Sequence, residues 1–497
     1  MALDRDSLKL LHDALARLDE GFETLPAADD DADPAAIARV LDEVAERLRD
    51  NYPYFHPLYA GQMLKPPHAV ARLAYSLATW INPNNHALDG GRASSRMEKE
   101  AVAEIARMFG WTEFLGHLCG GGTMANLEAL WVAGKLAPGK VILASKQAHY
   151  THGRISEVLG LRFESVPVDR LSRIDVTALE ARVAKGDVGT VVATMGTTAT
   201  GAVDPLPEIL RLRERFGFRI HADAAYGGYF TLAPSLAPDA RAAFDRIAEA
   251  DSIVVDPHKH GLQPYGCGCV LFRDPAVGRF YKHDSPYTYF SSTELHLGEI
   301  SLECSRPGAA AVALWATQRL FPLERGGELS SRLARSRAAA LALHARLGAD
   351  PRFVPAFAPE LDIVVWAMRA PSASEASRLA RAVFEEAARR DLHLAVAELP
   401  AAFFDLEKAG VRRDRETITC LRSVLMKPEH EAWIARIWER LDAAVALSVR
   451  RVPLEERRQA LDEEIRAYPT PIPRCDAQFN HLFEERARIA KELDELQ

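Results

Sequence analysis

The sequence predicts an α/β protein whose central, mostly parallel sheet is flanked by helices. Four short apolar runs alternate with helix-like stretches, as expected for strands covered on both faces: VILAS at 141–145, TVVATMG at 190–196, FRIHAD at 218–223 and SIVVD at 252–256. The 497 residues also exceed what one hydrophobic core usually organises. We therefore expect this α/β unit to be accompanied by further domains.

Four parts are expected along the chain. The run AIARVLDEVAERLRDN has apolar residues at helical spacing and predicts a helical N-terminal segment. Beyond the central region, DIVVWAM and TITCLRSVLM are strand candidates separated by helices, and two charged helical patterns near the end are split by YPTPIPRC. The expected parts are an N-terminal helical segment (1–90), a large α/β domain (91–330), a smaller α+β domain (331–450) and a C-terminal helical extension (451–497).

Composition and charge exclude several classes of protein. A net charge of −8 provides no basic field for nucleic acid. The N-terminal stretch has no apolar signal region and no run of eighteen uncharged apolar residues occurs, so we expect neither secretion nor a membrane span. Six scattered cysteines predict no disulfide framework and favour a reducing cytoplasm, and the CxC at 267–269 lacks the second pair that a zinc site needs.

The most informative segment is SIVVDPHKHGLQPYGCGCVLFRD at 252–274, where an apolar strand runs into a turn that carries Lys259 between two histidines. A lysine after a strand is usually an exposed surface residue. Its other interpretation is an amine that forms a Schiff base with pyridoxal 5′-phosphate, a cofactor whose aldehyde such a lysine holds and exchanges for a substrate amine.

That cofactor requires a carboxylate at its ring nitrogen, and FRIHADAAYGGYF supplies Asp223 at the carboxyl end of a predicted strand. Ligands bind at such strand ends in open α/β sheets. An ordinary helix N-cap is the alternative role for Asp223. The small residues that follow, Ala224, Ala225, Gly227 and Gly228, favour close approach to a ligand.

The cofactor's phosphate requires a cluster of donors, and CGGGTMANLEALW at 119–131 places three glycines and a threonine at the start of a helix. Free backbone N–H groups and the positive end of the helix dipole bind phosphate, with Gly122 and Thr123 as candidate donors. A purely structural turn is the alternative. The spacing matches neither of the common nucleotide-binding glycine motifs.

Two further strand ends carry polar residues that suit a cofactor ring. His149 in SKQAHYTHGRI opens a helical stretch, where its imidazole can lie against the pyridine face or serve in capping and packing. Thr197 and Thr198 in ATMGTTATGAVDP are placed to bond the cofactor or to close a turn.

Taken together and in this order, these segments resemble the group II pyridoxal-phosphate-dependent decarboxylases, which have fold type I, the aspartate-aminotransferase-like fold. The resemblance spans roughly residues 50–450 and is most specific at HADAAYGG and DPHK. It implies that Lys259 is the Schiff-base lysine, Asp223 the carboxylate at the pyridine nitrogen and His149 the stacking residue. The other cofactor-binding positions that it implies are Gly122, Thr123, Thr197, Ala225, Asp256 and His258.

The resemblance also implies two residues that act on the substrate. Arg422, in TITCLRSVLMKP, matches an arginine near the substrate carboxylate, and a surface arginine on a strand is its alternative role. A loop tyrosine returns a proton to the substrate carbon after CO₂ leaves. In RFYKHDSPYTYFSSTELHLGE we assign that role to Tyr287, with Tyr289 as the neighbouring choice and Tyr281 also in the segment.

The function so implied is that of a lyase of amino acid, and hence carboxylic acid, metabolism: decarboxylation of an L-amino acid to its amine and CO₂ by a cytoplasmic homodimer whose active site lies at the subunit interface. Similarity to microbial tyrosine decarboxylases favours an aromatic, tyrosine-like substrate, with His56, Tyr59 and Gln62 as pocket candidates. Glutamate or aspartate is the rival substrate class. The remaining alternatives are aldehyde formation, carbon–carbon lysis of a phosphorylated sphingoid base, and a catalytically silent scaffold.

Overall fold

A seven-stranded sheet forms the centre of the computed structural model, which describes residues 5–26, 33–282, 296–470 and 476–496. Its strand order is β1-β7-β6-β5-β4-β2-β3, and neighbours pair in parallel except at β7, which is antiparallel to both β1 and β6. The strands are β1 Leu115–Cys119, β2 Val141–Ser145, β3 Arg162–Val166, β4 Val188–Thr194, β5 Arg219–Asp223, β6 Ser252–Val255 and β7 Gly268–Phe272.

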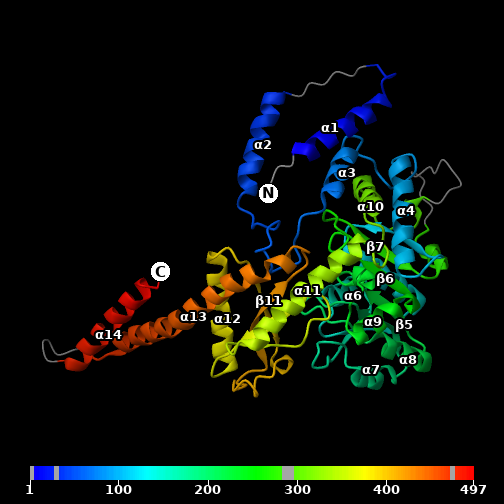
Figure 1. Cartoon of the computed structure of the whole chain (residues 1–497). Helices are drawn as coiled ribbons and strands as arrows, with labels where there is room; N and C mark the ends of the chain where they lie inside the picture. Colours follow the sequence, from blue (N-terminus) through cyan, green and yellow to red (C-terminus); the bar gives the residue numbers. More distant parts are fainter. Residues whose placement is uncertain (1–4, 27–32, 283–295, 471–475, 497) are drawn as a thin grey trace.

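Helices cover both faces of this sheet, because β2, β5 and β6 are almost entirely buried and each needs apolar neighbours on two sides. The expected α/β fold with a mostly parallel central sheet is confirmed (Figure 1). The flanking helices are α4 Arg92–Met108, α5 Gly122–Leu136, α6 Thr151–Val158, α7 Val176–Val183, α8 Leu206–Phe216 and α9 Pro238–Asp245. Short 3₁₀ turns are η1 Gly228–Leu232, η2 Ile247–Glu249, η3 Pro275–Phe280, η4 Leu297–Glu299 and η5 Ala401–Phe403.

A second, antiparallel sheet follows, in the order β10-β11-β9-β8. Its strands are β8 Phe353–Pro355, β9 Ile363–Met368, β10 Ala395–Pro400 and β11 Thr417–Val424, and its helices are α11 Glu328–Ala349, α12 Ala373–Arg389 and α13 His430–Ala467. Fully buried Trp366 on β9 lies in the core between this sheet and its helices. The small α+β unit thus has a core of its own. The expected boundaries at 330 and 450 fall inside α11 and α13, and the division into four parts stays a prediction.

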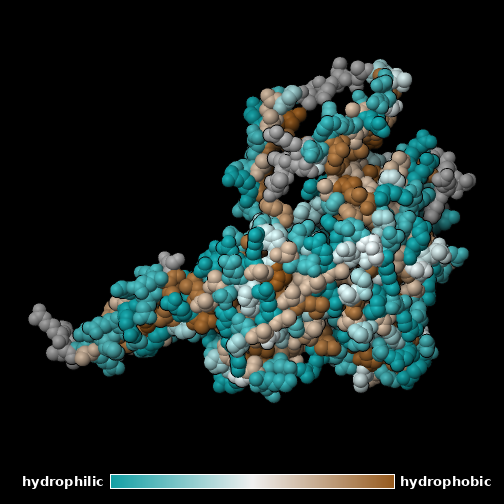
Figure 2. Space-filling model, viewed as in Figure 1, coloured by the Kyte–Doolittle hydropathy of each residue, from teal (hydrophilic) through white to brown (hydrophobic). Residues whose placement is uncertain are grey.

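The N-terminal region is helical, with α1 Arg5–Glu20, α2 Pro34–Leu48 and α3 Ala69–Thr79. α3 packs on α10, Gly308–Leu320, and α1 lies against α3. Figure 2 shows apolar atoms gathered around α3, whereas α2 stands away from the body of the molecule in Figure 1. No residue of α2 is buried.

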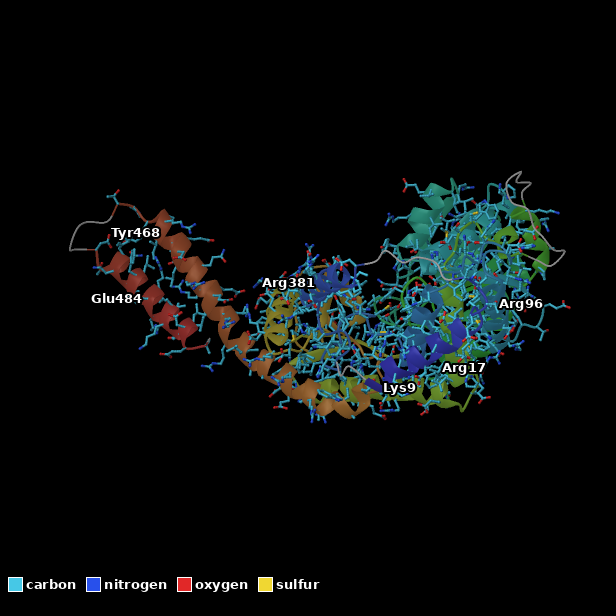
Figure 3. The ribbon with its side chains drawn as sticks, turned by 90° about the horizontal axis from the view of Figure 1, so that it is seen from above. Lys9, Arg17, Arg96, Arg381, Tyr468 and Glu484 are labelled. Carbon is cyan, nitrogen blue, oxygen red and sulfur yellow. The ribbon has the colours of Figure 1, made fainter. Side chains whose placement is uncertain are left out.

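The C-terminal helices form an arm that projects from the small sheet (Figures 1 and 3). α13 runs 38 residues with Pro453 inside it, and α14, Ala477–Asp494, packs back along its far half. Leu461 and Leu482 are part of the buried apolar cluster between the two helices. Within the described ranges, no helix is long and apolar enough to span a membrane.

Candidate active site

A cavity of about 520 Å³ opens at the carboxyl ends of five parallel strands, β1, β2, β4, β5 and β6. Segments far apart in the sequence meet there because parallel strands all end at the same edge of a sheet. Its lining includes Gly120 to Asn126 except Ala125, together with Leu127, His149, Thr151, Thr194, Gly196, Thr198, Asp223, Ala225, Tyr226, Asp256, His258, Lys259 and Glu303.

The glycine run forms the turn between β1 and α5. Gly121 has φ +138°, which only glycine adopts without strain, and a Cβ on Gly268 of β7 would lie 2.6 Å from the Gly121 backbone. This close approach fixes the start of α5 at the cavity wall, with Gly122 and Thr123 in the lining. The first N–H groups of a helix have no partners within the helix, so this end of the cavity is suited to an anion.

Asp223 is the last residue of β5 and is only 4% exposed. Its Oδ2 accepts a hydrogen bond from His152 Nε2 at 2.8 Å, and its Oδ1 accepts one from the Ala225 N–H at 3.2 Å. Burial acts to raise the pKa of Asp223, but the hydrogen bond from His152 and the positive charges nearby outweigh it, so the pKa lies well below its ordinary value. The cavity therefore has a buried, ionised carboxylate in its wall.

Lys259 lies in the turn after β6, and its Nζ is 3.0 Å from Asp256 Oδ2. The same carboxylate oxygen is 3.5 Å from His258 Nε2, while His258 Nδ1 is 2.8 Å from the Cys267 carbonyl oxygen. Burial lowers the pKa of His258, which favours the neutral ring. Asp256 thus holds the lysine amine in the cavity.

His149 precedes α6 and lies in the cavity wall, with its Nδ1 2.8 Å from the Thr151 hydroxyl. Burial lowers the pKa of His149, and the charge of Asp223 only partly opposes this. The ring is therefore neutral near pH 7 and presents an aromatic surface to the cavity.

The structure brings most of the expected cofactor-binding residues together: Gly122, Thr123, His149, Asp223, Ala225, Asp256, His258 and Lys259 all line the cavity. Thr197 is not among the lining residues, and its role in cofactor binding stays a prediction. Its hydroxyl is buried and is 2.8 Å from the Thr200 hydroxyl, because it closes the turn after β4, and the next residue, Thr198, lines the cavity instead.

The expected substrate residues lie outside the cavity lining. Arg422 on β11 donates to the carbonyl oxygens of Thr198 and Ala199, at 2.7 and 3.0 Å, and so reaches the site through the cavity-lining Thr198. His56 packs its ring against Trp433, and Tyr59 is buried beside Lys427, while Gln62 accepts a hydrogen bond from Arg422. Their roles remain predictions. Tyr287 and Tyr289 lie outside the described residues, and Tyr281 is buried against Trp131.

Several residues of the site were not predicted from the sequence, and three of them make hydrogen bonds that shape it. His152 follows His149 by three residues, and this spacing on a helical turn was the available signal that both face the same side. Tyr226 donates its hydroxyl hydrogen to Asp362 Oδ1 at 2.5 Å. Glu303 accepts from the Gly120 N–H at 3.0 Å, a contact across 183 residues that no local pattern indicates.

The donors of the cavity fit pyridoxal 5′-phosphate. Lys259 offers an amine for the aldehyde, Asp223 an ionised carboxylate for the ring nitrogen, and the glycine turn a set of N–H groups for the phosphate. Fold and cavity together define a pyridoxal-phosphate-binding protein of fold type I.

Comparison with known proteins gives the family. The model of the pyridoxal-dependent decarboxylase conserved domain matches residues 127–369. An L-tyrosine decarboxylase of Enterococcus faecium is 29% identical, over 59% of this chain and 64% of that protein, and an L-aspartate decarboxylase of Thermococcus kodakarensis is 29% identical, over 57% and 72%. Together with the fold and the cavity, these matches identify a pyridoxal-dependent decarboxylase domain in this chain, with pyridoxal 5′-phosphate as its cofactor.

Solved structures share the fold. Oryza sativa TDC with PLP and tryptamine has a TM-score of 0.71 at 19% identity, covering 90% of this chain and 99% of that one. Mouse CSAD in apo form has a TM-score of 0.70 at 21% identity, covering 86% and 91%. The chain covers less than two thirds of the length of the L-tyrosine decarboxylases of Enterococcus faecium and Levilactobacillus brevis, at 64% and 62%.

The contact between the glycine turn and Asp256 gives a first prediction. A Cβ on Gly122 would lie 2.7 Å from Asp256 Oδ2, so Gly122→Ala has to push this buried carboxylate away from Lys259. We expect the affinity for pyridoxal 5′-phosphate to fall about tenfold, or about 1.4 kcal/mol, in an equilibrium binding titration. Gly153→Ala on α6 is the control, because its added methyl meets nothing closer than 3.6 Å. Equal affinities in the two variants would contradict the packing argument.

Proposed function

We propose that this chain decarboxylates an L-amino acid to its amine and CO₂ with pyridoxal 5′-phosphate as cofactor. The observation that carries the proposal is that Lys259 and an ionised Asp223, from different strand ends, line one cavity with the helix N-terminus of α5. An amine, a buried carboxylate and an anion site are the groups that this cofactor needs. The match of residues 127–369 to the pyridoxal-dependent decarboxylase domain supports the choice of reaction.

When bound, the cofactor accepts the electron pair that the departing CO₂ leaves on the substrate carbon. The residues of this chain provide the conditions for that step. Asp223 would hold a proton at the ring nitrogen, Lys259 would bind the aldehyde and later release it to the substrate amine, and the α5 N–H groups would hold the phosphate. The neutral imidazole of His149, which lines the cavity, would pack against the ring.

Two residues would then act on the substrate. Arg422 is 5% exposed and already donates to the Thr198 carbonyl oxygen, so a small shift at Thr198 would bring its planar guanidinium toward a substrate carboxylate. Tyr287 is our choice for the residue that returns a proton to the substrate carbon from its phenolic oxygen, with Tyr289 as the neighbouring choice.

An aromatic, tyrosine-like substrate is favoured over an acidic one. Of the side chains in the described lining, Lys259 is the sole lysine or arginine and is already paired with Asp256, whereas Glu303 adds a negative charge. An acidic side chain would therefore meet repulsion, and Met124, Leu127 and Tyr226 offer apolar or aromatic contact. The rival class, aspartate or glutamate, has the support of relatives named as L-aspartate decarboxylases.

A homodimer with the site at the subunit interface is also part of the proposal. α2 supports it, because Ile37, Val40, Leu41, Val44 and Leu48 form one apolar stripe and remain 44–61% exposed in the single chain. A second copy of the chain would cover this stripe. A cytoplasmic location is proposed as well, in keeping with cysteines that are free thiols throughout the described residues, such as buried Cys267 and Cys269.

The covalent role of Lys259 can be tested by chemical reduction and peptide analysis. Borohydride reduction of the protein loaded with pyridoxal 5′-phosphate should fix the cofactor on the peptide that contains Lys259, because reduction makes the linkage permanent. Peptide mass spectrometry gives the position. Lys259→Ala should bind the cofactor only reversibly and yield no labelled peptide. Label on another lysine, or unchanged labelling of the variant, would refute the assignment.

The substrate class is tested by turnover of tyrosine, tryptophan, dihydroxyphenylalanine, glutamate and aspartate, with amine, CO₂, peroxide and ammonia measured together. We expect amine and CO₂ from the aromatic substrates because the lining lacks a free cation for an acidic side chain. Turnover of acidic substrates alone would reverse the preference, and abundant peroxide would indicate aldehyde formation instead.

The dimer is tested at α2. Val40→Glu and Leu41→Glu place charges in the apolar stripe and should shift the protein from dimer to monomer in analytical ultracentrifugation, with loss of activity. Arg39→Glu introduces the same side chain on the opposite side of the helix and should leave the dimer intact. A wild-type protein that is an active monomer would exclude the interface.

A further inference from the structure

The carboxylate of Asp223 has one side-chain hydrogen-bond donor among the described residues, and it is His152. His152 Nε2 lies 2.8 Å from Asp223 Oδ2, and the imidazole is completely buried. Its Nδ1 has no hydrogen-bond partner in the described part of the chain. The ring therefore forms its hydrogen bond with Asp223 alone and leaves its other nitrogen unpaired, which is unusual for a buried polar side chain and calls for a reason.

The other titratable groups that face Asp223 are already committed elsewhere. His221, two residues earlier on β5, is 2.8 Å from the Ser252 hydroxyl through Nδ1 and 2.8 Å from Asn126 Oδ1 through Nε2. Burial lowers the pKa of His221 to about 3, so this ring is neutral.

The remaining two groups belong to the cavity wall. His149 bonds the Thr151 hydroxyl and is held neutral by burial, and Lys259 is paired with Asp256. None of these three groups bonds the Asp223 carboxylate. Without His152, the carboxylate would keep only the Ala225 N–H at 3.2 Å, and burial would favour its neutral form.

The helix α6 explains how His152 reaches this place. His149 lies just before α6 and faces the cavity, and His152 is in the first turn of α6, where its backbone N–H donates to the His149 carbonyl oxygen at 3.2 Å. One short segment thus supplies both the imidazole in the cavity wall and the imidazole behind the carboxylate. The two rings have different tasks because only the second lies within hydrogen-bond distance of Asp223.

We propose that His152 is a positioning residue for Asp223: its Nε2–H holds the carboxylate in the orientation and the ionised state that a protonated cofactor ring nitrogen requires. The inference rests on the proposed function, because it assumes that this ring nitrogen faces Asp223. It assigns to His152 no contact with substrate or cofactor.

The test compares two probes by equilibrium binding. One is pyridoxal 5′-phosphate, and the other is its analogue in which a C–H group replaces the ring nitrogen. Removing His152 weakens only the interaction at the ring nitrogen, so the ratio of the two affinities isolates its effect from general damage to the cavity. For His152→Leu we expect this ratio to fall by about tenfold or more, since a charge-assisted hydrogen bond is lost.

Conservative variants keep the test decisive if the leucine variant does not fold. His152→Gln places an amide N–H donor at nearly the same distance from the Asp223 carboxylate. It should restore the ratio to within about threefold of the wild-type value. His152→Asn is too short to reach and should behave like the leucine variant. His344→Leu removes a half-buried histidine on α11, outside the cavity lining, and should leave the ratio unchanged.

The outcomes separate the inference from the proposed function. Equal weakening of both probes in the leucine and asparagine variants, or no recovery with glutamine, would show a merely structural role and overturn the inference while leaving the cofactor assignment intact. Failure of the wild-type protein to bind either probe would overturn the proposed function and this inference with it.

Discussion

One buried negative charge, the carboxylate of Asp223, sets the requirements for the rest of the site. An ionised carboxylate removed from water costs several kcal/mol unless hydrogen bonds and opposite charges replace its hydration. Here that replacement comes from His152 on α6, the Ala225 N–H and the nearby positive charge of Lys259. A protonated ring nitrogen in the cavity would add a further positive charge beside this carboxylate. The site is thus arranged around one buried negative charge.

Sheet topology brings these groups together. Parallel strands deliver their carboxyl ends to one edge, so residues separated by more than a hundred positions meet without any long-range sequence signal. β7 runs the opposite way and lies between β6 and β1, which lets the chain fold back immediately after Lys259. The glycines at 121 and 268 allow that return strand to pass directly against the anion-binding turn. The amine and the anion site are therefore adjacent because of backbone packing.

Local patterns predicted much of this arrangement. The parallel strands were predictable from their apolar runs. The glycine turn, Asp223 and Lys259 were predictable as well, because each belongs to a polar or glycine-rich segment at the end of such a run. Thr197 and Thr198 could not be distinguished, since only the fold of the turn decides which hydroxyl faces the cavity. Glu303 and Tyr226 were missed because their partners, Gly120 and Asp362, are distant in sequence. The antiparallel direction of β7 also depends on tertiary packing, which no short sequence motif predicts.

The most direct measurement of the central claim is a crystal structure of the protein grown with pyridoxal 5′-phosphate. We expect continuous electron density from Lys259 Nζ to the cofactor, with the ring nitrogen directed at the Asp223 carboxylate and the phosphate at the start of α5. Cofactor density joined to a different residue, or a ring nitrogen that faces away from Asp223, would contradict it.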